Sequence, residues 1–420
     1  MKYVFGFVGC GAGANFFIKQ LINNKELFSK SLIHLYEKNP YPFGLIRDGI
    51  APDHQKSKQL IKEFSDNIIK HKNQIEYFGN VNISNINKLK KYYSAIILSM
   101  GAQQDNKLNI PGEDLKYVYS SRQISNWYNC SIHSKKIEIN NKSSNLVIIG
   151  NGNVSIDIAR ILALRNIEDL SQYEISTQRL KEIQYVKKYI KKVFIIARRG
   201  IEFSAFTTKQ IRQFCVLAKK NNWRINVDLN EFNCLNLNRD NKRKIEVLQK
   251  YGNQIPIDYY RLNNYPDKHI FFIYNSKPFK IDKYNTIYFN KKDNTSFSLP
   301  SGMLIKSIGV NTGTIKSINN GNGIYKVGWS NTNGKGTITQ TLYDSMKVYE
   351  KIMRDIKQGR IQLKTASTRF NTINTLLKGQ SKIMSFDDWL RIDKYEKEEG
   401  RKIGKSREKI LKREQFLQLL

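Results

Sequence analysis

Two glycine-rich loops, one at the start of the chain and one near residue 150, are the segments best suited to bind a nucleotide. The first reads Gly9-Cys10-Gly11-Ala12-Gly13-Ala14, and the second reads Gly150-Asn151-Gly152-Asn153-Val154-Ser155. Each loop follows an apolar run and precedes a segment with helical spacing. Glycines at such a turn let backbone N–H groups approach a pyrophosphate, which the start of the next helix then stabilises. Either loop alone is a weak signal, because a glycine-rich turn also occurs without a ligand.

Charged residues at the end of the next strand indicate which nucleotide each loop binds. Glu37 ends the strand expected at 32–37 and supplies an acceptor for a pair of ribose hydroxyls. Together with the first loop it favours an adenine dinucleotide. Arg198 and Arg199 follow the strand expected at 193–197, where an NADP enzyme carries a cation for the 2′-phosphate. The pair therefore favours NADP, and a solvent-exposed pair without a ligand is the alternative.

The elements that must position these residues form two units of strand, glycine loop and helix. For the first unit we expect a strand at 2–8, a helix at 13–24 and a strand at 32–37. For the second we expect strands at 146–149 and 193–197, with helices at 153–164 and near 177–191 between them. This order is typical of an α/β protein with two Rossmann-like nucleotide-binding domains. A strand and turn at 299–311 and a helix at 337–358 follow, whereas 219–296 shows no clean pattern.

The composition excludes some classes and leaves others open. The four cysteines form neither CxxC nor CxxxxC, which argues against a disulfide framework, a zinc site and the paired thiol of a disulfide reductase. We expect no metal site. No apolar run approaches the roughly 18 residues of a membrane-spanning helix. The net charge of +34 suits a polyanionic partner, although Lys, Asn, Ile and Tyr are overused throughout, so that part of the excess reflects compositional bias.

Residues 37–54, between the two loops, form a stretch that composition does not explain: EKNPYPFGLIRDGIAPDH. With it the sequence closely resembles the adrenodoxin reductase family, whose YEK-P-PFGL-R-G-APDH signature is nearly intact here. The resemblance covers nearly the full length and is poorest over 215–298. It continues through Phe78–Val81, Leu98–Ala102, Ile110–Glu113, Trp127–Asn129, Gly152–Val154, Arg198–Gly200, Ala205–Thr207, Ser307–Gly309, Gly328–Trp329, Ser385–Trp389 and Gly404–Lys409.

The resemblance implies an FAD domain, residues 1–103 and 310–420 with a C-terminal extension, interrupted by an NADP domain, residues 104–309. It implies a ferredoxin–NADP(+) reductase in which NADPH reduces FAD by hydride transfer and the flavin passes single electrons to a [2Fe-2S] ferredoxin, in support of iron–sulfur cluster or related mitochondrial biosynthesis. A monomer in mitochondria is expected, with no presequence visible before the first strand. The alternatives are another NADPH-dependent flavoprotein reductase and a basic FAD-binding protein without enzymatic activity.

The resemblance also implies site residues. Those for FAD are Gly9, Gly11, Gly13, Glu37, Leu45, Val81, Trp329, Gly336, Thr337 and Ile338, and those for NADP are Asn151, Gly152, Asn153, Val154, Arg198, Arg199, Gln210 and Gly336. Gln210 stands where the family usually has Glu, so we expect weaker nicotinamide positioning rather than lost binding. His54 and Asp157 would lie near the flavin and manage protons, or would only hold loops in place, since hydride chemistry belongs to the cofactor.

The partner implied by the resemblance is an acidic [2Fe-2S] ferredoxin. Its docking site would be a basic patch of Arg212, Arg239, Lys242, Arg243 and Lys244, which suits a small contact steered by charge. A merely solvated basic face is the alternative. We expect no nucleic-acid partner, and peripheral association with a membrane is left open.

Overall fold

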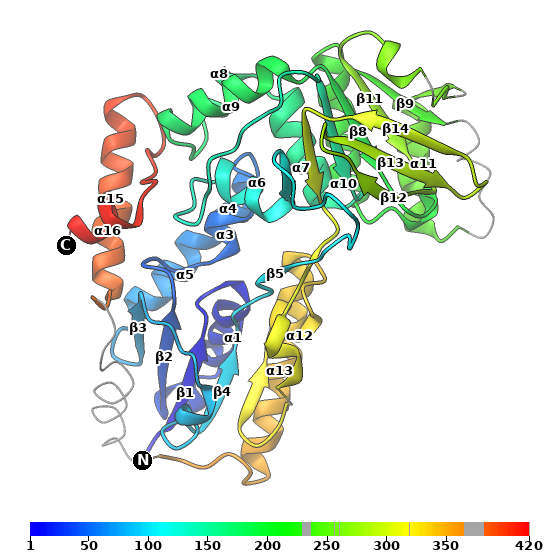
Figure 1. The fold of residues 1–420 in the computed structure, drawn as a ribbon. Coiled ribbons are helices and arrows are strands. Elements are labelled where there is room, and N and C mark those ends of the chain that lie inside the picture. The colour runs from blue at the N-terminus through cyan, green and yellow to red at the C-terminus, as the bar shows by residue number, and fades with distance from the viewer. Residues whose placement is uncertain (229–236, 256, 260, 319, 365–381, 420) are drawn as a thin grey trace. The chain divides into compact units, whose positions relative to one another are not determined.

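The chain folds into two compact units, each described below by itself (Figure 1). The computed structural model describes residues 1–228, 237–255, 257–259, 261–318, 320–364 and 382–419. Unit 1 comprises Met1–Ile50, His54–Gln104 and Gly309–Leu420, and unit 2 comprises Ala51–Asp53 and Asp105–Ile308. Unit 1 is thus formed by two separate stretches of the chain, with most of unit 2 between them. The short segment Ala51–Asp53, which joins unit 2, was not foreseen.

Unit 1 is built on a five-stranded parallel sheet in the order β17-β4-β1-β2-β3. Its strands are β1 (Tyr3–Val8), β2 (Ser31–Glu37), β3 (Ile75–Gly79), β4 (Ala95–Leu98) and β17 (Ile324–Lys326). β1 and β4 are almost wholly buried, as their continuous apolar runs predict for strands covered on both faces. Because β17 comes from the second stretch, Gly309–Leu420, the sheet of unit 1 requires both stretches of the chain.

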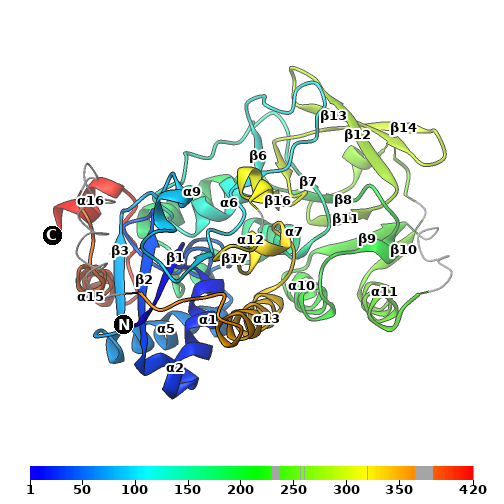
Figure 2. The same ribbon diagram turned by 90° about the horizontal axis from the view of Figure 1, so that it is seen from below.

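In unit 1, helix α1 lies between α13 and α5 (Figure 2). The ring of Phe16 on α1 lies 5.3 Å from that of Phe64 on α5, and the ring of Phe17 lies 5.7 Å from that of Tyr349 on α13. α15 runs beside β3, where the Met384 carbonyl accepts from the Gly79 N–H at 2.7 Å. The helices are α1 (Ala12–Asn23), α2 (Lys25–Ser29), α3 (Leu45–Asp48), α4 (Gln55–Lys58), α5 (Leu60–Lys70), α12 (Trp329–Thr332), α13 (Ile338–Lys357), α15 (Phe386–Lys402) and α16 (Arg413–Gln418).

Unit 2 is built on a seven-stranded parallel sheet in the order β10-β9-β11-β8-β7-β15-β6. Its strands are β6 (Val118–Ser120), β7 (Asn145–Ile149), β8 (Lys192–Ile196), β9 (Arg224–Asp228), β10 (Asn253–Ile255), β11 (His269–Ile273) and β15 (Met303–Lys306). The central strands β7, β8 and β11 are buried along their whole length. The predicted class, an α/β protein with two Rossmann-like parallel sheets, is confirmed.

Helices and turns of unit 2 connect these strands. They are α6 (Ser121–Tyr128), α7 (Asn153–Ala159), a π-helix η2 (Arg160–Leu164), α8 (Ile167–Ser171), α9 (Thr177–Tyr189), the 3-10 turn η3 (Ile201–Phe203), α10 (Thr208–Lys220) and α11 (Arg239–Tyr251). The helix expected at 153–164 is therefore α-helical only to Ala159 and then widens to π geometry. Of the helices described in the two units, none is long and apolar enough to cross a membrane.

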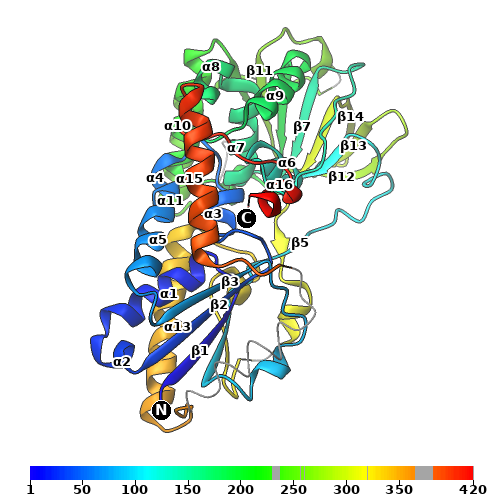
Figure 3. The same cartoon turned by 90° about the vertical axis from the view of Figure 1, so that its left-hand side faces the viewer.

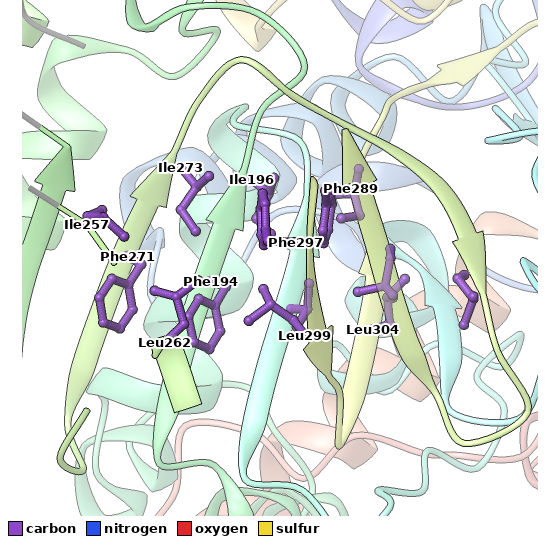
Figure 4. Packing of buried hydrophobic residues seen from close by; sticks show 14 residues of the cluster. Phe194, Ile196, Ile257, Leu262, Phe271, Ile273, Phe289, Phe297, Leu299 and Leu304 are labelled. Carbon is purple, nitrogen blue, oxygen red and sulfur yellow. The ribbon is translucent and has the colours of Figure 1, made fainter. Parts of the chain in front are cut away.

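An antiparallel sheet accounts for the last part of the segment that showed no clean pattern. Its strands are β12 (Ser276–Ile281), β13 (Thr286–Lys291) and β14 (Ser296–Pro300). Phe289 and Phe297 from this sheet share one buried cluster with Phe194 and Phe271 of the parallel sheet (Figure 4). The alternation of buried and exposed residues in β14 follows from having one face on this cluster and the other in solvent.

Candidate functional site

The first glycine loop joins β1 to α1 with its backbone tightly fixed. Gly9 has a φ of 102°, and a Cβ there would lie 2.6 Å from the Ser99 carbonyl oxygen, so only glycine fits. The Gly9 N–H donates to the Tyr36 carbonyl at 2.7 Å, and the Ser99 hydroxyl donates to the Gly9 carbonyl at 2.6 Å. Gly11 caps α1 without a side-chain hydrogen bond. The first N–H groups of α1 are therefore left for an anionic group.

Bare backbone borders open space around this loop. A Cβ at Gly101 would meet no atom within 4 Å, and a Cβ at Gly11 would meet only the Ser99 carbonyl oxygen, at 3.9 Å. A Cβ at Gly44, in the turn before α3, would meet only the Cα of Gly11, at 3.6 Å. Three glycines from separate segments thus converge at the carboxyl end of β1. Bare backbone of this kind is what a dinucleotide pyrophosphate requires, and its binding here stays a prediction.

Glu37 ends β2 as predicted, and its carboxylate braces the loop. One oxygen accepts from the Cys10 N–H and the other from the Asn39 N–H, both at 3.0 Å. Burial raises the pKa of Glu37 above its usual value, although these two N–H groups act to lower it. Because each carboxylate oxygen can accept more than one hydrogen bond, ribose binding by Glu37 is compatible with this role and stays a prediction.

The distal segment of unit 1 approaches α1 at Gly13. A Cβ there would lie 3.3 Å from the Val327 side chain, and the Gly13 carbonyl accepts from the Ser345 hydroxyl of α13 at 3.2 Å. Gly328, the residue after Val327, has a φ of 64° and starts the turn that carries Trp329. A larger residue at Gly13 would push this turn away from the loop.

Trp329, Gly336, Thr337 and Ile338 lie together at the start of α13, and their contact with a flavin stays a prediction. The Trp329 indole N–H donates to the Gly336 carbonyl at 3.0 Å. Thr337 caps α13 by accepting from the Gln340 N–H, and the Gln340 side chain accepts from the Thr337 N–H in return. Trp329 is therefore fixed to the turn from which Ile338 begins the helix.

Leu45 and Val81, the remaining two residues predicted for FAD, differ in exposure. Leu45 begins α3 and is 41% exposed, whereas the following residues of that helix are buried. Val81 is 1% exposed and belongs to the core cluster beside β1 and β2, with its N–H donating to the Glu37 carbonyl at 2.9 Å. Leu45 can touch a ligand directly, while contact of the Val81 side chain with an adenine stays a prediction.

The second glycine loop, between β7 and α7, repeats the design in unit 2. Gly150 has a φ of 115°, and a Cβ there would lie 2.1 Å from the Ser307 carbonyl oxygen, whereas a Cβ at Gly152 would meet no atom within 4 Å. The Asn151 side-chain amide donates to the Ser204 hydroxyl at 3.2 Å, and the Asn153 side-chain oxygen accepts from the Thr207 N–H at 2.8 Å. The two asparagines thus anchor the turn at 204–207, which leaves the loop backbone and the 40% exposed Val154 for a ligand.

Arg198 and Arg199 follow β8, which pairs directly with β7, and both side chains are exposed. The guanidinium carbon of Arg199 lies 4.7 Å from the ring centroid of Phe203, which is itself 50% exposed. This cation–π contact orients the Arg199 guanidinium at the carboxyl end of the sheet. The pair lies at the same sheet edge as the second loop, where a 2′-phosphate would be bound.

A buried polar cluster joins Asp157 and Gln210 through Arg160, a residue to which the sequence assigned no role. Arg160 donates to both oxygens of Asp53 at 2.7 and 2.8 Å, to Asp157 at 2.8 Å and to the Gln210 side-chain oxygen at 3.3 Å. Burial would lower the pKa of Arg160, but the two carboxylates outweigh it and raise that pKa. Asp53 precedes His54, which is the N-cap residue of α4. The His54 side chain makes no capping hydrogen bond. The APDH motif and the helix after the second loop were the available signals for this cluster.

The predicted docking residues lie on α10 and α11, which pack against each other. Arg212, Arg239, Lys242 and Arg243 are exposed. The assignment of Lys244 to this patch is wrong, because the residue is 8% exposed and its ammonium group pairs with Asp240 at 2.7 Å. Lys244 follows the exposed Arg243, and a step of one residue along a helix turns the side chain to another face. On this buried face Lys244 donates to the Ser204 carbonyl at 3.2 Å.

The described parts of both units contain no group of three or more His, Cys, Asp or Glu residues that could hold a metal ion.

Comparisons with known proteins assign the chain to a family. The model of the pyridine nucleotide-disulphide oxidoreductase family matches residues 12–296. The solved structure of Mycobacterium tuberculosis FprA in complex with NADPH superposes with a TM-score of 0.86 at 25% identity, covering 100% of this chain and 99% of that one.

Curated relatives narrow this assignment. The probable mitochondrial NADPH:adrenodoxin oxidoreductase of Dictyostelium discoideum is 30% identical, over 90% of this chain and 84% of its own length. The mitochondrial NADPH:adrenodoxin oxidoreductase of Homo sapiens is 27% identical, over 98% of this chain and 91% of its own length. The chain therefore belongs to the pyridine nucleotide-disulphide oxidoreductase family and, within it, to the NADPH:adrenodoxin oxidoreductases.

Proposed function

We propose that unit 1 holds FAD, that unit 2 holds NADPH, and that the chain delivers electrons from NADPH to an acidic [2Fe-2S] ferredoxin. The observation that carries this proposal is the pair of glycine loops, each opening onto free space at the carboxyl edge of its own parallel sheet. Only the loop of unit 2 has an arginine pair at the end of the adjacent strand. When bound, FAD supplies a hydride acceptor that releases electrons one at a time.

The residues of unit 1 fit the parts of FAD. The uncapped start of α1 at Gly11 suits the pyrophosphate, and Glu37 suits the ribose hydroxyls beside it. Leu45 supplies an exposed apolar contact from the turn that touches the loop. Trp329, fixed to the Gly336 carbonyl, supplies an aromatic surface next to the start of α13. These residues bind and orient the cofactor and shield it from water.

The residues of unit 2 fit NADPH. Backbone groups from Asn151 to Val154 suit the pyrophosphate, and the guanidinium groups of Arg198 and Arg199 suit the 2′-phosphate. Gln210, whose side-chain oxygen accepts from Arg160, stands at the start of α10 for the nicotinamide end. Its neutral amide avoids adding a third carboxylate to a cluster that already holds Asp53 and Asp157.

Of the two residues predicted to manage protons, His54 is the better candidate. The carboxylate of Asp157 is engaged by the Arg160 guanidinium at 2.8 Å, which favours a positioning role for Asp157. Histidine is the residue type suited to proton exchange near neutral pH, which favours His54 for this role.

The names of the curated relatives suggest a redox partner and a cellular compartment. These names contain the words adrenodoxin and mitochondrial, and we propose the same class of partner and the same compartment for this chain. Arg212, Arg239, Lys242 and Arg243 supply a basic surface for an acidic ferredoxin. Transient electron-transfer contacts are small and steered by charge, so a few exposed cations suffice.

The test is a spectral titration. The purified protein should be yellow from noncovalent FAD, and anaerobic NADPH should bleach the flavin absorbance. A protein that takes up no FAD would refute the proposal for unit 1. Yellow protein that neither NADPH nor NADH bleaches would favour the alternative of an FAD-binding protein without enzymatic activity.

A further inference from the structure

The C-terminal motif Gly404–Lys409 folds back onto α15. The Lys405 N–H donates to the Gly400 carbonyl and the Glu408 N–H donates to the Glu396 carbonyl, both at 2.8 Å. A Cβ at Gly400 would lie 2.6 Å from the Cα of Arg407, so the glycine is required for this close approach. The motif and the helix therefore form one tight element at the end of the chain.

Two arginines from opposite ends of the sequence converge on Glu396, which is wholly buried in this element. Arg47 of α3 donates to both oxygens of Glu396, at 2.6 and 3.1 Å, and Arg407 donates to one of them at 2.6 Å. The Arg47 guanidinium also lies over the rings of Tyr41 and Trp389, at 4.6 and 5.0 Å. Burial alone would raise the pKa of Glu396, but the two guanidinium groups hold that pKa below its usual value.

The backbone of Arg47 is held as well as its side chain. The buried ammonium groups of Lys58 and Lys409 each donate to the Arg47 carbonyl at 3.2 Å. Lys409 belongs to the C-terminal motif, so this motif contacts α3 directly through Lys409 and indirectly through Arg407 and Glu396. We call Glu396, Arg407 and Lys409 together the C-terminal clasp. Figure 3 shows α15 next to α3, with the start of α15 near β3.

The clasp reaches the first glycine loop through α3. This helix has only four residues, Leu45–Asp48, which is too short to be stable by itself. Just before it, the Phe43 N–H donates to the Cys10 carbonyl at 2.9 Å, and Gly44 lies against Gly11. The position of Leu45 above the loop therefore depends on what holds Arg47.

We propose that the C-terminal clasp sets the affinity of unit 1 for FAD, with Glu396 as a positioning residue that acts through Arg47. The inference rests on the proposed function, in which FAD lies on the first glycine loop. It assigns a role to the motifs at 385–389 and 404–409, which that function leaves unused. Loss of the clasp would free the turn that carries Leu45 while the loop itself stays anchored to Ser99 and Tyr36.

The test measures FAD binding to the apoprotein rather than turnover. After FAD is removed, titration with FAD and quenching of flavin fluorescence give the Kd. Glu396→Gln keeps the shape of the side chain but removes its charge, and it should raise the Kd at least tenfold. Asp355→Asn is the matched control, because this buried carboxylate of unit 1 accepts from Tyr325 at 2.6 Å and pairs with Arg360 at 2.9 Å, away from the loop. It should leave the Kd unchanged.

A double variant keeps the inference testable if Glu396→Gln does not fold. Arg47→Met with Glu396→Leu replaces the buried Arg47–Glu396 pair by apolar residues, a change that proteins often tolerate without loss of stability, while Arg407 keeps its ion pair with Asp393. Its Kd for FAD should also rise at least tenfold, while binding of 2′,5′-ADP to unit 2 stays unchanged. An unaltered Kd for FAD in either clasp variant, or an equal rise in Asp355→Asn, would overturn the inference. Wild-type apoprotein that takes up no FAD at all would refute the proposed function itself, and the inference with it.

Discussion

Replacing Arg198 and Arg199 by Ala should convert the enzyme from a strong preference for NADPH to near indifference between NADPH and NADH. A charge-assisted hydrogen bond to a phosphate contributes about 1.5–3 kcal/mol. Both side chains are exposed, so solvent screening places each near the lower end of that range. Because about 1.4 kcal/mol is a factor of ten, each single variant should raise the KM for NADPH about tenfold, and the double variant about a hundredfold.

Arg199 offers a finer version of this experiment. Its guanidinium lies over Phe203, so Arg199→Lys keeps the charge but loses the planar contact that orients it. This variant should fall between wild type and Arg199→Ala. The assay is steady-state reduction of ferricyanide with each nucleotide, and Arg212→Ala is the control because that exposed arginine lies outside the predicted nucleotide site. Equal losses for NADPH and NADH, or a loss of the same size in the control, would show that the arginine pair does not read the 2′-phosphate.

The remaining predictions concern docking and buried charge. Arg243→Glu should lower ferredoxin-dependent cytochrome reduction without changing flavin reduction by NADPH, because this exposed residue belongs to the proposed docking surface and not to the proposed nucleotide sites. Lys244→Met should leave the dependence of that rate on ferredoxin concentration unchanged, because Lys244 is buried. Arg160→Met removes the Arg160 guanidinium from Asp157 and leaves Asp53 with the more distant Arg165, and it should cost about 3–5 kcal/mol in the free energy of unfolding, measured in urea. Because the pKa of Glu396 is lowered in the folded protein, its ionised carboxylate stabilises the fold at pH values above 4.5, the ordinary pKa of Glu. This stabilisation should be lost as the pH falls through the lowered pKa. The double variant at Arg47 and Glu396 should lose less stability over the same pH range.

Each of these expectations has an outcome that would contradict it. Unchanged ferredoxin turnover in Arg243→Glu would mean that α11 is only a solvated face. A weaker dependence on ferredoxin in Lys244→Met would restore this residue to the docking surface. An Arg160→Met protein as stable as wild type would show that the buried cluster contributes little. Parallel acid unfolding curves for wild type and the clasp double variant would remove Glu396 as a source of pH dependence.

The sequence predicted the two parallel sheets and the glycine loops because these depend on local patterns. Apolar runs such as Tyr3–Val8 form strands wherever they are buried on both faces, and Gly9 and Gly150 fit turns that no other residue can adopt. The start of α13 was also foreseen, to within one residue. Thr337 caps this helix, and Gln340 completes the capping box.

The features that escaped prediction depend on contacts between distant residues. The three-stranded sheet β12–β14 lies in a segment rich in Lys and Asn, where its alternation is visible only once Phe289 and Phe297 are seen to share a cluster with the parallel sheet. The burial of Lys244 depends on which face of α11 meets its neighbours. The pairs Arg160–Asp53 and Arg47–Glu396 join residues more than 100 positions apart, and no local pattern encodes such pairs.

The most direct test of the account is NADPH-driven reduction of cytochrome c by the FAD-loaded protein, with and without a small acidic [2Fe-2S] ferredoxin. The account predicts fast reduction only when NADPH and ferredoxin are both present. It also predicts a rate that falls steeply with salt, because the Debye length shrinks from about 10 Å at 0.1 M to about 3 Å at 1 M. Flavin that NADPH bleaches but that transfers electrons to cytochrome c no faster when ferredoxin is added would contradict it.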